Sequence, residues 1–197
     1  MTSAQWRTAL ILLAAALAAP VSAHTGSDAG SHHGFVDGFT HPFGGADHLL
    51  AILAVGFAAA AGTRRAWIAP AAFASAMLAG AMLAGAGIAV PVVEPMIAAS
   101  VLVLGLIVAA RARFPAVVLA LPAGLFAVFH GAAHAAELQA ASLGPIAGML
   151  AATSVLLAAG MALGWASTTR NAWWARFAGA ATSLAGAALL VSLVARS

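Results

Sequence analysis

Residues 115–139 have the sequence PAVVLALPAGLFAVFHGAAHAAELQ, a long apolar run that ends in a group of ionisable side chains. A helix rises about 1.5 Å per residue, so about 20 apolar residues cross the hydrocarbon core of a bilayer. Histidine and glutamate are costly inside a membrane, and where they occur they mark functional sites. The stretch therefore predicts a membrane-spanning helix that carries a functional site.

The whole chain has the composition of a membrane protein. Of its 197 residues, 63% are hydrophobic and 7% are charged, whereas about 25% of the residues of a soluble domain are charged. The sequence therefore predicts an all-α integral membrane protein, a bundle of six transmembrane helices. The six expected spans are approximately residues 46–62, 67–89, 93–110, 115–139, 145–165 and 174–195.

Residues 1–23 have the features of a cleaved signal peptide. Arg7 precedes an apolar stretch at 9–19, and the small residues that a signal peptidase recognises follow at Val21, Ser22 and Ala23. The alternative is an uncleaved first helix, but the stretch at 9–19 is short for a span. We expect cleavage after Ala23, which leaves a polar, His-containing periplasmic arm at 24–40 and a six-helix transmembrane domain at 41–197.

Basic residues predict how the chain lies in the membrane, because short cytoplasmic loops are enriched in Lys and Arg. The connections after the first, third and fifth spans carry Arg64, Arg65, Arg111, Arg113, Arg170 and Arg176. We therefore expect those loops in the cytoplasm, both mature ends outside, and a multi-pass protein of the bacterial inner membrane. The net charge of +3 is spread over loops rather than gathered on one face, so no nucleic-acid partner is expected.

The fourth span carries the most specific chemical pattern. His130 and His134 are four residues apart and Glu137 follows three residues later, so all three share one helical face. Two neutral imidazoles and a carboxylate can offer N and O lone pairs to one cation. We predict that the three side chains bind a metal ion.

A second group of candidate ligands lies at the start of the first span. His41, Asp47 and His48 are near one another in the sequence, and Pro42 suits the first turn of a helix. Asp47 could bind the ion directly or hold an imidazole in one tautomer. Glu94, at the outer end of the third span, is a further candidate with weaker support, and so is His24 in the arm.

The ligand types leave the metal and the reaction open. The chain has no Cys, and imidazole with carboxylate suits Ni, Co, Zn and Cu alike. Each His could instead be a structural hydrogen-bond partner. A membrane-embedded zinc-dependent hydrolase or a bis-His haem protein would also use buried histidines, and these remain alternatives to a binding site for a transported ion.

The two groups resemble the motifs of the HupE/UreJ family of nickel and cobalt permeases, which accompany hydrogenase or urease systems. The family's first motif is matched by His41, Asp47 and His48. Its second motif is matched by Phe129, His130, Gly131, Ala133, His134 and Glu137. Ala135 stands where the family usually has Gly. The resemblance covers the whole chain and implies uptake of Ni²⁺ or Co²⁺ as a transported substrate, with no permanent cofactor.

The sequence also bears on how transport is driven. The chain has no Lys and no GxxxxGK phosphate loop, so it does not hydrolyse ATP in that way. We expect a secondary transporter driven by the membrane potential, and not an enzyme. Besides the divalent metal ion, the expected partners are membrane lipid and, through the Gly and Ala faces of its helices, a second copy of the chain.

Overall fold

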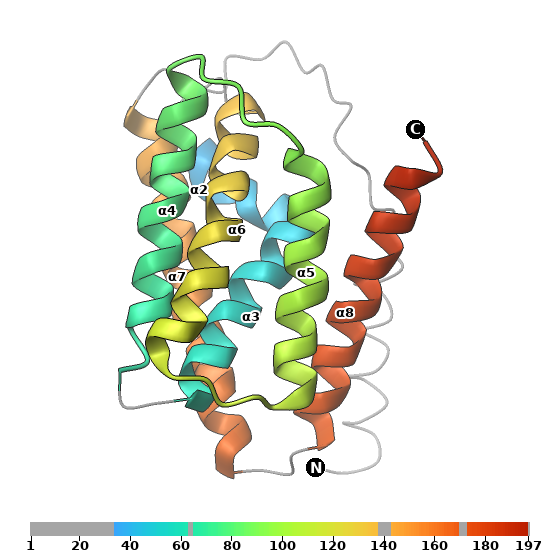
Figure 1. Ribbon diagram of the computed structural model, residues 1–197. Coiled ribbons are helices and arrows are strands. Elements are labelled where there is room, and N and C mark those ends of the chain that lie inside the picture. The colour runs from blue at the N-terminus through green and yellow to red at the C-terminus, as the bar shows by residue number, and fades with distance from the viewer. Residues whose placement is uncertain (1–33, 63–64, 138–142, 170–172, 197) are drawn as a thin grey trace. The chain divides into compact units, whose positions relative to one another are not determined.

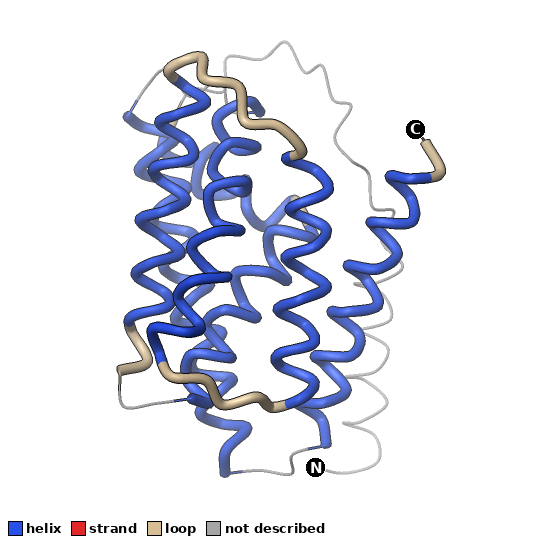
Figure 2. The backbone as a smooth tube through the Cα atoms, in the orientation of Figure 1, coloured by secondary structure: helices blue, strands red, loops and turns tan. Residues whose placement is uncertain are grey.

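The computed structural model describes residues 34–62, 65–137, 143–169 and 173–196, and these ranges contain helices joined by loops and turns, with no strand (Figure 2). The predicted signal peptide at 1–23 and the candidate ligand His24 lie outside them. In chain order the helices are α2 (Phe35–Gly44), α3 (Ala46–Gly62), α4 (Ile68–Gly85), α5 (Val93–Ala110), α6 (Ala116–Glu137), α7 (Leu143–Thr169) and α8 (Trp173–Val194) (Figure 1).

The all-α membrane class is confirmed in the described ranges. There, five helices, α4 to α8, are long and apolar enough to cross a membrane, and a sixth span results if α2 and α3 are counted together. Large apolar side chains cover the outside of the bundle, for example Leu121 (70% exposed) and Leu184 (71% exposed). Such a surface suits lipid tails and would be a liability in water.

The helix boundaries follow the predicted spans closely, with the largest differences at the ends of α7 and α4. Helix α7 ends at Thr169, four residues after the predicted end at 165. Helix α4 ends at Gly85, four residues before the predicted end at 89. Gly87 has φ +78, in the left-handed region that glycine adopts without strain. Its conformation helps the chain leave the helix and turn into the loop before α5.

The first predicted span differs more, because a separate helix precedes it. The sequence predicts a polar arm at 24–40 and a first helical turn at Pro42. In the structure, α2 begins at Phe35, within the predicted arm, and Pro42 lies inside this helix. The helix ends before Gly45, whose backbone is extended, and α3 starts at a bend of 87° from α2. Because α3 has 17 residues, it is only about 26 Å long.

Helix α3 lies at the centre of the bundle and contacts each of the six other described helices. Around it, α4 packs on α6, α5 on α8, and α2 together with α3 on α7. The core consists mainly of alanine, with larger residues such as Ile52, Phe73 and Leu104 fully buried. In Figure 1, the turn between α3 and α4 and the turn between α5 and α6 lie at the lower end, and the loop from α4 to α5 lies at the upper end.

Glycines bring the paired helices close together. A Cβ atom on Gly80 of α4 would overlap the backbone carbonyl of Val128 in α6, and one on Gly131 would overlap the carbonyl of Met77 in α4. The glycines of α7 at 160 and 164 approach α3 in the same way. Small residues therefore let the helix backbones touch, as expected where helices associate in lipid.

We predict that Gly80→Ala lowers the stability of the folded protein by about 1–3 kcal/mol, because α4 and α6 must separate to admit the methyl group. Gly124→Ala, in the same interface, is the matched control, since its nearest neighbours, Ala72 O and Ala76 Cβ, would be 3.8 Å away. Thermal unfolding in detergent, followed by tryptophan fluorescence, should show a loss for Gly80→Ala alone. Equal losses for both variants would contradict this packing.

Candidate metal centre

The first group of candidate ligands lies on both sides of the break between α2 and α3. Gly45 lies at the break, and a Cβ there would be 2.9 Å from Asp47 Oδ1 and 3.1 Å from His48 Nδ1. The missing side chain therefore leaves room for these two groups at the start of α3. His41 lies in the last turn of α2, on the other side of the bend.

Four imidazole rings from three helices contact one another in a row. His48 of α3 packs against both histidines of α6, with ring centroids 4.7 Å from His130 and 4.3 Å from His134. His41 of α2 packs against His134 at 4.9 Å. The structure thus joins the two predicted groups, which are about 80 residues apart in the sequence, into one cluster, which we call the imidazole cluster (His41, His48, His130 and His134).

Three of the four histidines in the imidazole cluster are buried, and His41 is half-buried. His48 is 6% exposed, His130 is 0% exposed and His134 is 1% exposed. The ring of Phe73 in α4 adds an apolar wall, with its centroid 5.9 Å from that of His130. Side chains this deeply buried would ordinarily have every polar atom hydrogen-bonded.

Two rings of the imidazole cluster, those of His48 and His130, are hydrogen-bonded to side chains outside the cluster. Asp47 Oδ1 lies 2.8 Å from His48 Nδ1 and also accepts the backbone N–H of His48 at 2.8 Å. Ser100 Oγ of α5 lies 2.9 Å from His130 Nε2 and donates to the carbonyl of Ile97 at 2.6 Å. The Asp47 side chain is 29% exposed, so it lies at the edge of the cluster and contacts His48.

Four ring nitrogens have no hydrogen-bond partner among the described residues. They are His48 Nε2, His130 Nδ1, His134 Nδ1 and His134 Nε2. A buried polar atom without a partner costs about 1–3 kcal/mol. Neutral imidazole nitrogen is also the commonest protein ligand for transition metals, so these atoms fit a site that takes a metal ion.

The rings do not form a closed cage. Within the described ranges, no three His, Asp or Glu side chains are grouped so that they could hold one ion together. The rings meet in successive pairs instead, in the order His130, His48, His134 and His41. Such a row suits stepwise contact with an ion better than permanent storage of one.

The cluster lies at the end of the bundle away from the arginine-bearing turns. His48 is in the first turn of α3 and His130 is in the last third of α6, whereas Arg65 follows α3 and Arg113 precedes α6. Helices α3 and α6 run in opposite directions, and the first turn of α3 lies beside the last third of α6 (Figure 1). The histidines and the arginines therefore lie in opposite halves of the bundle.

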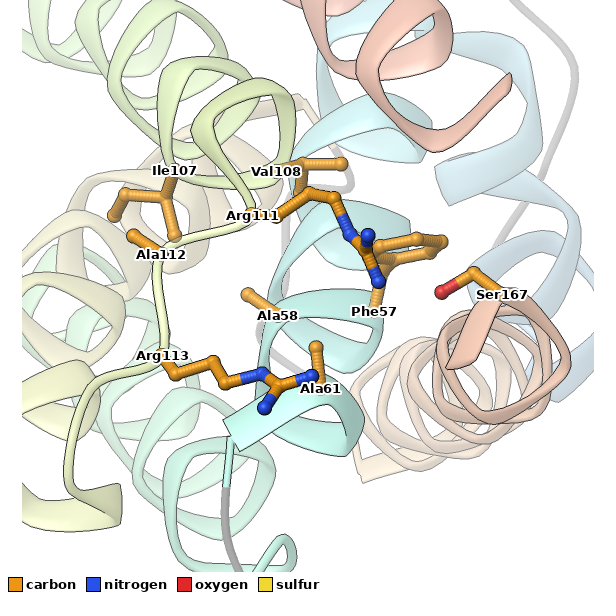
Figure 3. A pocket seen from close by; sticks show the side chains of 9 residues that line it. All are labelled: Phe57, Ala58, Ala61, Ile107, Val108, Arg111, Ala112, Arg113 and Ser167. Atoms are coloured by element: carbon orange, nitrogen blue, oxygen red, sulfur yellow. The ribbon is translucent and has the colours of Figure 1, made fainter. Parts of the chain in front are cut away.

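A cavity at the arginine end has a different chemistry. It lies where α3, α7 and the α5–α6 turn meet, and Figure 3 shows Arg111 beside Phe57 and Ser167, with Arg113 near Ala61. The described residues that line it include two cationic side chains and no His, Asp or Glu. This cavity is therefore unsuited to hold a metal cation.

Comparison with known proteins agrees with the two motifs. The family described as HupE / UreJ protein matches residues 11–189. The chain belongs to the HupE/UreJ family. Protein HupE of Rhizobium leguminosarum bv. viciae is 45% identical over 184 residues, which cover 91% of this chain and 95% of that protein. No solved structure matches the chain.

The HupE/UreJ resemblance seen in the sequence is thus confirmed, and the structure adds the surroundings of its motif residues. Ala135, which follows His134 in the second motif, is 6% exposed and packs in the core. Its methyl group therefore occupies packed space next to His134. Each His, Asp and Glu of the two motifs is present in the chain.

The structure does not place the remaining predicted ligands in the imidazole cluster, and His24 and the side chain of Glu137 lie outside the part of the chain that it describes. Glu94 is exposed in the first turn of α5, and it is not among the residues that contact the rings of the imidazole cluster as described above. Glu137 is the last residue of α6, and its side chain is not among those described. Both acids therefore remain predictions as ligands, together with His24.

Sequence reasoning missed Ser100 and Phe73. A signal for Ser100 existed, since it is the one hydroxyl-bearing residue in the predicted span 93–110. A sequence alone could not show that this hydroxyl faces His130 on another helix. Phe73 carried no such signal, because it is one apolar residue among many in α4.

Proposed function

We propose that this chain is a permease that takes up Ni²⁺ or Co²⁺ across the bacterial inner membrane and supplies hydrogenase or urease maturation. The observation that supports it most is the imidazole cluster with its four unpartnered ring nitrogens. Imidazole suits several divalent metals, so the choice of nickel or cobalt rests on the family to which the chain belongs.

The proposed topology has six spans, with α2 and α3 together forming the first. The arginine-bearing turns lie in the cytoplasm, according to the rule for basic loops, and both mature ends lie outside. The imidazole cluster then lies toward the outer side. This is the position expected of a site that is loaded from the periplasm.

In the proposed path, the hydrated ion reaches the outer end and exchanges water for ring nitrogen atoms. His41, the half-buried member of the imidazole cluster, receives the ion at the outer side, with Asp47 as a further ligand there. His134, His48 and His130 then carry it deeper in the order in which their rings meet, and Glu137 is a further ligand beside His134. Rocking of the helices then releases it inward. An inside-negative potential contributes about 4.6 kcal/mol per 100 mV for a dication, which is twice the figure for one charge, so ATP is not needed.

Both alternatives receive less support from the geometry. A haem held between two axial histidines needs space between their rings, but the cluster's rings are in direct contact at 4.3 to 4.9 Å. A hydrolase needs a cleft open to its substrate, whereas His130 and His134 are 0% and 1% exposed. Transport requires only that the ion reach the rings during a conformational change.

Uptake of radioactive ⁶³Ni²⁺ into nickel-limited cells tests the proposal. Cells that express the wild-type chain should accumulate more label than cells with an empty vector. Excess unlabelled Co²⁺ should compete, and excess Mg²⁺, which prefers oxygen ligands, should not. If neither ⁶³Ni²⁺ nor Co²⁺ accumulates above the empty-vector level at normal membrane abundance, the proposed function is wrong.

A further inference from the structure

The hydroxyl group of Ser100 lies between a backbone carbonyl and a ring nitrogen of His130. Ser100 is fully buried, and its Oγ has two neighbours, the carbonyl oxygen of Ile97 at 2.6 Å and His130 Nε2 at 2.9 Å. A hydroxyl has one hydrogen, and a carbonyl oxygen can only accept. The short contact to Ile97 therefore uses the Ser100 hydrogen, and His130 Nε2 must donate its own.

This arrangement leaves His130 with its lone pair on Nδ1. A neutral imidazole has one donor nitrogen and one acceptor nitrogen, so Nδ1 is the acceptor when Nε2 carries the proton. Nδ1 is also the buried His130 atom that has no hydrogen-bond partner among the described residues. The hydrogen-bonding pattern and the unpartnered atom thus identify the same nitrogen.

The tautomer of His48 can be assigned in the same way, but the nitrogen that carries the proton is Nδ1 instead of Nε2. An ionised carboxylate can only accept, so Asp47 Oδ1 holds the proton on His48 Nδ1 at 2.8 Å. The lone pair is then on Nε2, which is again the unpartnered atom. Two neighbouring rings, perpendicular to each other with centroids 4.7 Å apart, are therefore each held in the tautomer that leaves the unpartnered nitrogen able to bind a cation.

We propose that Ser100 is a positioning residue that holds His130 in its Nε2–H tautomer, so that Nδ1 is the atom with which His130 binds the transported ion. The statement about the ion rests on the function proposed above. The tautomer is a property of the protein without any ion. Partners of this kind, which orient a ligating imidazole from behind, change metal affinity or activity by about 10- to 100-fold when they are removed.

The tautomer can be measured directly. The full chain is labelled with ¹⁵N-histidine, placed in lipid nanodiscs without metal at about pH 8, where a histidine of ordinary pKa is neutral, and studied by ¹⁵N NMR. Signals of His130 are those that disappear in His130→Gln. We expect the wild-type proton on Nε2, and a mixture of both tautomers in Ser100→Ala.

Ser183→Ala is the matched control for this measurement. Ser183 is also a buried serine that donates to a carbonyl of its own helix, that of Gly179 at 2.9 Å, but it has no imidazole partner. Its removal should leave the His130 signals unchanged. The proposal is overturned if the proton of His130 is on Nδ1 in the wild type, a result that needs no variant. It is also overturned if His130 keeps the Nε2–H tautomer unchanged in Ser100→Ala.

Uptake of ⁶³Ni²⁺ links the tautomer to transport. Ser100→Ala should reduce uptake by about 10- to 100-fold at equal membrane abundance, and Ser100→Thr should restore most of it, because threonine can also bond to the carbonyl one turn earlier. If Ser100→Ala and Ser100→Thr lose uptake equally, and His130 keeps its wild-type tautomer in both, then Ser100 acts only through packing. That result would overturn the proposal. If the wild type shows the tautomer but no uptake, the proposed function fails while the tautomer assignment stands.

Discussion

Replacing His48 by alanine is expected to abolish metal uptake while the chain remains in the membrane. His48 is the ring that joins the two histidines of α6, at 4.7 Å from His130 and 4.3 Å from His134. Its removal interrupts the row of rings and deletes the unpartnered Nε2. Since the loss of an outer partner alone costs up to about 100-fold, we expect a fall of at least about 100-fold in ⁶³Ni²⁺ uptake.

Membrane abundance of each variant must be measured beside uptake, because His48 is buried. Ser183→Ala serves again as a control, since it changes a buried polar residue of α8 whose hydroxyl bonds to Gly179. It should transport like the wild type. Uptake by His48→Ala within about twofold of the wild type, at equal abundance, would exclude His48 from the transport path.

Replacing Asp47 distinguishes the two roles that the sequence leaves open for it. Asp47→Ala removes the acceptor that lies 2.8 Å from His48 Nδ1, whereas Asp47→Asn keeps an oxygen that can accept the same hydrogen. If Asp47 acts by holding the His48 tautomer, Asp47→Ala should lose about 10- to 100-fold of the uptake. Asp47→Asn should then retain most of it.

The concentration dependence of uptake provides the measurement for the Asp47 variants. A higher half-saturating concentration of Ni²⁺ in Asp47→Ala than in Asp47→Asn would support the positioning role. Equal losses in both variants would show that the carboxylate charge itself is needed. Asp47 would then be a direct ligand, and its side chain, 29% exposed, would be the first to meet the ion.

The sequence predicts the long helices well because lipid imposes a simple rule on them. A span must be apolar and about 20 residues long, and the observed starts of α3 and α5 coincide with the predicted ones. Helix α2 escaped prediction because Phe35–Gly44 is short and contains Gly38 and Pro42. Packing on α7 stabilises it, since Gly38 lies against the backbone of Pro145.

The candidate site is predictable only in part for a related reason. Helical spacing places His130 and His134 on one face, and a pairing of α3 with α6 could be suspected from the chemistry. The contact of His41 with His134 depends on the 87° bend between α2 and α3, which no periodicity reveals. The contribution of Ser100 depends on how α5 is rotated against α6, which only tertiary packing determines.

The central claim is that this chain alone carries a divalent transition metal through its imidazole cluster, and flux into proteoliposomes tests it most directly. Purified protein is reconstituted, an inside-negative potential is imposed with potassium and valinomycin, and internal Ni²⁺ is followed with an enclosed dye. We predict potential-driven entry with the wild type and entry at the protein-free rate with His48→Ala. Wild-type vesicles that admit Ni²⁺ no faster than protein-free vesicles, or equally fast entry with His48→Ala, would contradict the account.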